Sequence, residues 1–139
     1  MDIEHTKEAV KKEEGFRLET YKCTEGHLTG GYGHKMLEGE VPPTDHAGWL
    51  KIFERDFARA MTGADDLLTL CPNIDETARH IVVEMVYQMG SYGVSRFKKF
   101  LQALQDSDYK EASVQMLDSR WAKQTPNRAN RMSERMANI

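Results

Sequence analysis

The sequence is poor in cysteine and has no long apolar run, and each of these features excludes a class of protein. Its 139 residues contain two cysteines, Cys23 and Cys71, far apart in the chain, which excludes a scaffold stapled by disulfides. No apolar run approaches the roughly 18 residues that a membrane-spanning helix requires. The N-terminal segment alternates charges and lacks the apolar core of a signal peptide. We therefore expect a protein made in a cytoplasm, without a membrane anchor.

The chain also lacks an excess of positive charge, since its net charge is −3, and this argues against a general nucleic-acid-binding protein. The exception is the segment 119–139, where five cations stand against one anion, Glu134. This local excess could attract an anionic polymer, but a solvated helix face is the commoner explanation of such a pattern. No two histidines have the spacing typical of metal ligands, so we expect no metal and no cofactor. The histidines are His5, His27, His34, His46 and His80.

Apolar residues make up 40% of the chain and charged residues 29%, the balance of a globular protein. Periodicity and turn residues predict a chain of helices that is interrupted by one short glycine-rich stretch, which is predicted to form a small sheet. Residues 16–36 are expected to form an antiparallel hairpin or three-stranded sheet, and residues 37–44 a loop. The expected helices are 3–14, ended by Gly15; 45–62, capped by Thr44 or Asp45 and stopped by Gly63; 76–89; 93–105; 108–123; and one that begins at Thr125-Pro126.

These elements predict a single α+β domain over residues 1–139, or two lobes sharing one core helix. A small sheet lobe spans about 14–44 and a connecting helix about 45–63. Residues of about 64–139, together with the N-terminal helix, form a larger all-helical lobe. A binding site is expected in the cleft between the lobes.

Glu14 is the first candidate for chemistry, because it lies in the last turn of the first expected helix. The partial negative charge of a helix C-terminus disfavours a carboxylate, and burial would add to this effect. A carboxyl group with a raised pKa is what general acid catalysis requires. Taken alone, an ordinary exposed glutamate at a helix end explains the same position.

The segment that follows Glu14 carries a spaced motif. Eight residues separate Glu14 from Cys23, five separate Cys23 from Thr29, and the stretch ends in Gly31-Tyr32-Gly33-His34. This pattern resembles the phage-type lysozymes, the endolysins of glycoside hydrolase family 24. Two further segments are similar to that family and follow in its order, MVYQMG at 85–90 and SRWAKQTPNRANR at 119–131. The resemblance covers nearly the whole chain.

The resemblance implies a lysozyme-like fold and hydrolysis of the bond between N-acetylmuramic acid and N-acetylglucosamine in peptidoglycan. Glu14 matches the family's general acid, and Arg128 the arginine that pairs with it. Thr29 matches a threonine that holds the attacking water, and Cys23 occupies the second catalytic position. His34 and Asp56 match a structural pair. The residues that match substrate contacts in the cleft are Tyr87, Gln88, Trp121 and Gln124.

Three positions leave alternatives open. Cys23 stands where an aspartate is also found in the family, and a thiol could act as base, as nucleophile or as a group that holds water. Glu25 is expected to contact substrate, to supply a carboxylate on the same side if the segment is extended, or to be only a turn residue. Glu84, on the buried helix, must be paired or protonated. Arg128 is one candidate partner, and if Glu84 competes for it, Glu14 is freer to stay protonated.

Two functions follow from these observations. The first is an active endolysin that lyses a host cell, kept in the host cytoplasm until a holin-type pore lets it reach the periplasmic wall. The second is an inactive lysozyme-like domain that binds peptidoglycan glycan strands or a protein partner. The intact Glu14 and Thr29 favour the enzyme. We expect a monomer, and we expect no binding to nucleic acid.

Overall fold

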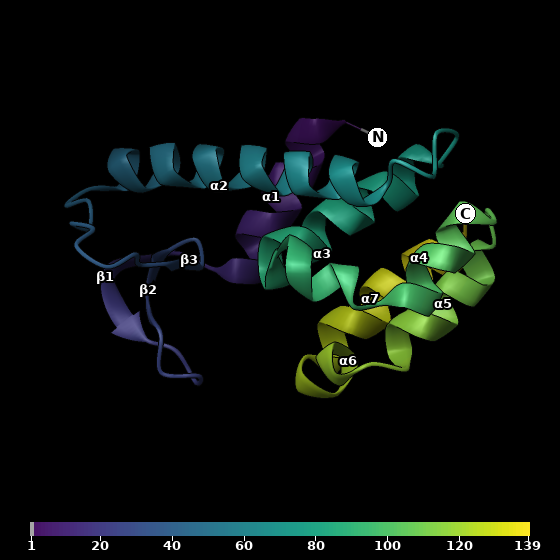
Figure 1. Cartoon of the computed structure of the whole chain (residues 1–139). Coiled ribbons are helices and arrows are strands. Elements are labelled where there is room, and N and C mark those ends of the chain that lie inside the picture. The colour runs from purple at the N-terminus through teal and green to yellow at the C-terminus, as the bar shows by residue number, and fades with distance from the viewer. Residues whose placement is uncertain (1) are drawn as a thin grey trace.

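A computed structural model describes residues 2–139 of the chain, and within this range it contains seven α-helices and one sheet of three strands. The elements are arranged as a small sheet lobe and a larger helical lobe joined along a long helix, α2 (Figure 1). This confirms the predicted α+β class. The bounds are α1 Ile3–Glu14, β1 Arg17–Lys22, β2 Leu28–Gly31, β3 His34–Lys35, α2 His46–Leu67, α3 Glu76–Ser95, α4 Lys98–Gln105, α5 Tyr109–Leu117, α6 Arg120–Gln124 and α7 Pro126–Ala137.

The sheet is antiparallel, with strand order β1-β2-β3. Tyr21 pairs with Thr29, and the tight turn between these strands is closed by hydrogen bonds between Cys23 and His27 and between Gly26 and Cys23. The sheet rests on Trp49 of α2, whose ring would lie 2.6 and 2.4 Å from a Cβ at Gly30 and Gly31. These two glycines therefore allow the sheet to approach the helix closely.

Helix α2 is longer than the sequence predicts. Asp45 caps its first turn by accepting a hydrogen bond from the Gly48 amide at 2.8 Å, as expected. The helix passes through Gly63, however, and ends at Leu67. A Cβ at Gly63 would lie 3.1 Å from Ser91 and 3.2 Å from Val86. The glycine thus serves close packing of α2 on α3, and the prediction that it stops the helix was wrong.

The buried helix α3 lies at the centre of the helical lobe. It packs against α1, α2 and α7 and buries Ala78, Ile81, Val82 and Met85, as its periodicity predicts. Gly90, at φ +80°, breaks the helical backbone, yet a further turn continues to Ser95. The expected helix 93–105 is therefore divided between the end of α3 and α4.

Two other expectations for this lobe need correction. The expected helix 108–123 is two helices, α5 and α6, because Ser119 begins a new helix and caps it by accepting from the Ala122 amide. Thr125 precedes Pro126 as predicted, but its hydroxyl does not cap α7. It donates instead to the Trp121 carbonyl at 3.0 Å.

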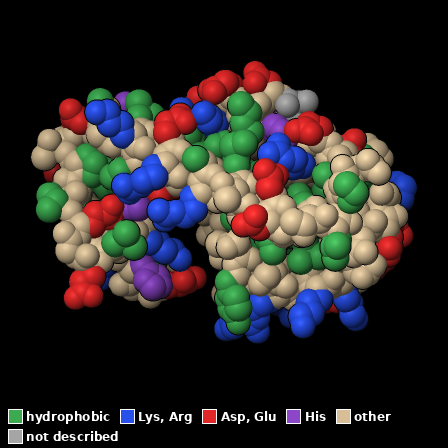
Figure 2. All heavy atoms as spheres, turned by 45° about the horizontal axis from the view of Figure 1, so that its top comes forward, with side chains coloured by type: hydrophobic (Ala, Val, Ile, Leu, Met, Phe, Trp, Pro, Cys, Tyr) green, Lys and Arg blue, Asp and Glu red, His purple; other side chains and the backbone are tan. Residues whose placement is uncertain are grey.

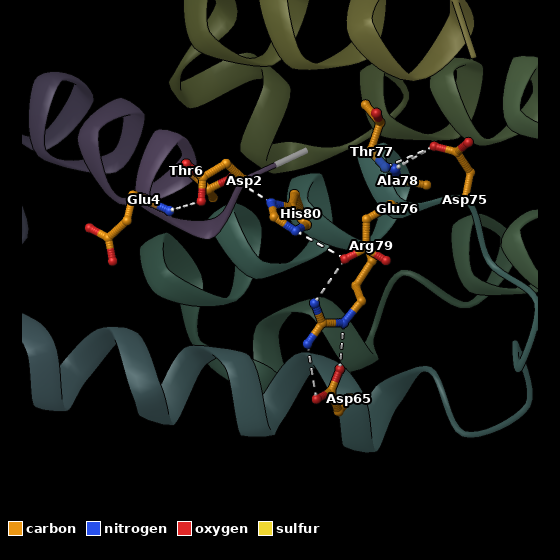
Figure 3. A network of polar contacts seen from close by, with 10 residues as sticks. All are labelled: Asp2, Glu4, Thr6, Asp65, Asp75, Glu76, Thr77, Ala78, Arg79 and His80. Atoms are coloured by element: carbon orange, nitrogen blue, oxygen red, sulfur yellow. Dashed lines mark hydrogen bonds and ion pairs between the residues drawn. The ribbon is translucent and has the colours of Figure 1, made fainter.

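A polar network fixes the N-terminal part of α1 to the helical lobe (Figure 3). Thr6 Oγ1 lies 2.5 Å from Nδ1 of the buried His80, and the other ring nitrogen of His80 lies 3.1 Å from the Glu76 carboxylate. Arg79, next to His80, donates twice to Asp65 of α2, at 2.9 and 3.2 Å. Helix α1 is thus held at its start by α3, which leaves its C-terminal end to reach the space between the lobes. None of the helices within residues 2–139 is both long enough and apolar enough to cross a membrane.

Candidate active site

Glu14 is the last residue of α1, and the chain turns into the sheet lobe directly after it. Gly15 has φ +69° and its amide closes the helix on the Lys11 carbonyl. The Glu14 side chain is 14% exposed and accepts a hydrogen bond from Nη1 of Arg128 at 3.1 Å. On its other side lies the backbone of Gly33, where a Cβ would stand 2.8 Å from Glu14 Oε1. The acid is therefore held between the two lobes.

Two opposing effects act on the ionisation of Glu14. Burial raises the pKa of its carboxyl group above the ordinary value, and the Arg128 guanidinium opposes this through its charge and its hydrogen bond. Burial is the larger effect, so the pKa is raised. A carboxyl group with a raised pKa can hold a proton and deliver it to a leaving oxygen.

Cys23 and Thr29 lie on the sheet lobe, at the end where the turn joins β1 and β2. The thiol is free and half-buried, and Thr29 is buried with its hydroxyl donating to the His27 carbonyl at 3.0 Å. The Glu25 amide lowers the pKa of the Cys23 thiol, and the His27 amide acts in the same direction, while partial desolvation opposes both. Hydrogen-bond donors around the sulfur favour its thiolate form.

A cavity of about 680 Å³ lies between the lobes, and Figure 2 shows the surface hollowed there. Four of the five residues expected to contact substrate line it: Glu25, Gln88, Trp121 and Gln124. Trp121 donates its indole N–H to Gln88 at 2.9 Å, which fixes both side chains. Glu25 reaches the cavity from the turn after Cys23, so the extended segment assumed for it does not exist.

Tyr87 does not line this cavity. Its hydroxyl donates to the Tyr32 carbonyl at 2.6 Å, and its ring packs on Phe53. It borders a second cavity of about 390 Å³, together with His34 and Asp56. The structure therefore gives Tyr87 the role of holding the glycine-rich strand end against α3.

His34 and Asp56 form the expected pair, with His34 Nδ1 2.6 Å from the Asp56 carboxylate. A third member was missed by the sequence analysis: Glu40 lies 2.8 Å from His34 Nε2 and also accepts from Arg55 at 3.3 Å. The hydrogen bond to Asp56, then that to Glu40, raises the pKa of His34 against the effect of burial. The sequence shows only that Glu40 follows His34 by six positions. Because Glu40 lies in a loop, no periodicity predicts that its side chain returns to the histidine.

Glu84 is buried, as its place on α3 predicts, but it does not compete for Arg128 by direct contact. It accepts a hydrogen bond from Arg135 Nη1 at 2.9 Å. Arg131, between them on α7, pairs with Glu13. Glu84 therefore contacts Arg135, two turns further along α7, and not Arg128.

Comparisons with known proteins agree with this geometry. The family model described as phage lysozyme matches residues 11–138. A probable T4-type lysozyme of Dictyostelium discoideum is 32% identical, with 94% of this chain and 92% of the relative covered. The pre-baseplate central spike protein Gp5 of Enterobacteria phage T4 is 26% identical over 91% of this chain and 26% of its own length. The peptidoglycan hydrolase gp36 of Pseudomonas phage phiKMV is 28% identical over 98% of this chain and 15% of its own length.

Proposed function

The chain belongs to the phage lysozyme family, and from that premise we propose that it hydrolyses the β-1,4 bond between N-acetylmuramic acid and N-acetylglucosamine, with Glu14 as general acid. Lysozyme-type hydrolysis of the bacterial cell wall follows from the family and from a relative named as a peptidoglycan hydrolase. The observation that carries the finer proposal is the position of Glu14. It is buried between the lobes with a raised pKa and one charged partner.

In the proposed reaction, the glycosidic oxygen takes the proton of Glu14 as its bond to the anomeric carbon breaks. A water molecule attacks that carbon and gives up a proton, and solvent then returns a proton to Glu14. Arg128 holds the carboxyl group in place through a single hydrogen bond at 3.1 Å. One such contact orients the acid, while burial outweighs the effect of the cation on its pKa.

Cys23 and Thr29 are proposed to act on the water. Donors around the Cys23 sulfur lower the pKa of the thiol, and a thiolate can accept the proton that the water releases. The same thiolate could attack the anomeric carbon directly and form a covalent intermediate. The two routes differ in product, because one displacement inverts the anomeric centre and two displacements retain it.

The test is the clearing of purified Gram-negative cell walls, stripped of outer membrane, by the wild type and by Glu14→Gln, Cys23→Ser and Cys23→Asp. We expect Glu14→Gln to lower the rate by about 10²–10⁴-fold, the range that a positioned general acid contributes. Activity in Cys23→Asp with loss in Cys23→Ser would indicate a base, and the anomeric form of the product would separate base from nucleophile. Clearing by Glu14→Gln at the wild-type rate would remove Glu14 from this role.

The alternative function, an inactive domain that binds glycan strands or a protein partner, makes the opposite prediction for the same experiment. A folded wild-type protein would bind the walls without clearing them. The lytic role in a host cell and release through a holin-type pore stay predictions of the sequence analysis.

A further inference from the structure

The second cavity, of about 390 Å³, has no part in the reaction described so far. It adjoins the larger cavity between the lobes, because Lys35 of β3 and Gln88 and Met89 of α3 line both. Gly33, against which the Glu14 carboxyl group lies, also belongs to its wall. A substituent of a glycan strand bound at the acid can therefore reach this second cavity.

The wall of the second cavity carries two cations without a partner. Asp56 is the one carboxylate among the described residues that line it, and it is already bound by His34 Nδ1 at 2.6 Å. Arg59, one turn further along α2, forms no ion pair within residues 2–139, and the same is true of Lys35. Both residues are exposed. They are thus free to bind an anion from outside, and a guanidinium can hold a carboxylate through two parallel hydrogen bonds.

Apolar and neutral polar side chains complete the lining of the second cavity. Leu37, in the loop after β3, lines it with 62% of its surface exposed, and Val86 and Met89 of α3 line it as well. Ser91 and Gln88 add a hydroxyl and an amide, which can hydrogen-bond to a peptide backbone. Carboxylates, alkyl groups and backbone amides together are the chemistry of a short acidic peptide.

We propose that the second cavity is a subsite for the acidic peptide attached to N-acetylmuramic acid, with Arg59 and Lys35 binding its carboxylates and Leu37 covering its alkyl part. The inference rests on the proposed function, since it takes peptidoglycan as the substrate. A sugar without its peptide carries a lactyl carboxylate at most, and it brings neither backbone amides nor a long alkyl chain to this lining. The chain should therefore prefer glycan strands that still carry their peptides.

Binding of a soluble probe tests the subsite without catalysis. The probe is the tripeptide L-Ala-γ-D-Glu-meso-diaminopimelate, and its matched control is the same tripeptide with amidated carboxyl groups. By calorimetric titration, Arg59→Gln and Lys35→Gln should each weaken binding of the acid form by about 2- to 5-fold, the effect of an ion pair open to solvent. The double variant, and amidation of the probe, should each weaken it by about 10-fold. Lys51→Gln, on α2 but outside both cavities, should bind like the wild type.

A second measurement compares kcat/KM for peptide-bearing walls with kcat/KM for strands whose peptides an amidase has removed. We expect the ratio of the two to fall by about 3- to 10-fold in the double variant Arg59→Gln/Lys35→Gln and to stay at the wild-type value in Lys51→Gln. The ratio is the measure because Lys35 pairs with Thr29 in the sheet. A disturbance of catalysis at Thr29 would lower both rates alike and leave the ratio unchanged.

Two results would overturn the inference. One is an equal loss on both substrates, since strands without peptides keep the lactyl carboxylate. The other is tripeptide binding that neither the double variant nor amidation weakens, in proteins shown to be folded by their unfolding temperatures. Failure of the proposed function would look different, because the wild type would leave the walls intact while Arg59 and Lys35 still bound the acid tripeptide.

Discussion

At the scale of single residues, the position of Glu14 depends on a neighbour with no side chain. Gly33 lies against the acid at φ +75°, and a Cβ there would stand 2.8 Å from Oε1 and 3.1 Å from the carboxyl carbon of Glu14. The glycine-rich segment before His34 thus has two functions. Gly30 and Gly31 bring the sheet onto Trp49, and Gly33 leaves room for the carboxyl group of Glu14.

Gly33→Ala is therefore expected to displace Glu14 and to lower wall-clearing activity on the order of 10²-fold, because a misplacement of about 1 Å can cost that much. Gly39→Ala is the matched control. It has a similar positive φ of +79° with nothing within 4 Å of the added Cβ, so it carries the backbone strain without the contact. Equal losses of activity in the two variants would show that strain alone, and not contact with Glu14, limits position 33.

The sequence predicted the pair of Glu14 and Arg128, but it did not predict the partner of Glu84. Spacing on α7 places Arg128 and Arg135 on one side, but it does not say which carboxylate each will meet. That depends on how α1 and α3 cross α7, a tertiary property that periodicity does not contain. For this reason Glu84 was assigned to Arg128 and lies on Arg135.

At the scale of elements, His34 joins three segments that are otherwise loosely connected. Its two ring nitrogens contact Asp56 of α2 and Glu40 of the loop after β3. The carboxylate at each nitrogen favours the doubly protonated imidazole, so the pKa of His34 is raised. The sheet lobe is thereby fixed to α2 by a charge that depends on pH.

A raised histidine pKa stabilises the folded state below the unfolded value of about 6.5, and this contribution is lost as pH rises through the folded pKa. We expect His34→Gln to lower the free energy of unfolding by about 1.5–3 kcal/mol in this range, the usual contribution of a hydrogen bond to a charged group. The difference from wild type should shrink at alkaline pH. Urea unfolding at several pH values measures it, and a difference that grows with pH would contradict the assignment.

Two glycines show why the ends of helices were predicted less well than the helices themselves. The sequence predicts that Gly63 ends α2, but Gly63 lies inside the helix, because its lack of a side chain admits Val86 and Ser91 of α3. Gly90 was given no special role but breaks α3 at φ +80°. A glycine signals either a turn or a close approach, and only the packing of neighbouring helices decides between them.

At the scale of the whole molecule, charge is distributed unevenly over a chain whose net charge is −3. Five cations line the cavity between the lobes against two carboxylates, and Lys and Arg side chains flank the hollow in Figure 2. The cations are Lys35, Arg96, Lys98, Lys99 and Arg120, and the carboxylates are Glu25 and Asp118. The basic segment noticed in the sequence contributes Arg120 alone to this surface.

This surface should attract a polymer that carries carboxylates, such as a peptide-substituted glycan. We expect Lys98→Gln/Lys99→Gln to clear walls about 2- to 10-fold more slowly at low salt and to respond less to added salt, because clefts of one sign concentrate an oppositely charged substrate. Lys51→Gln/Lys110→Gln changes the net charge equally at positions outside this cavity. Identical salt profiles for the two double variants would show that net charge alone matters.

The position of Glu14 at the junction of the lobes has a mechanical consequence. The chain passes between the lobes at Gly15 and along α2. A rotation of the sheet lobe relative to the helical lobe would therefore have its hinge close to Glu14. A group near a pivot moves least when the arms swing. Any opening between the lobes would therefore leave Glu14 in nearly the same place relative to Arg128.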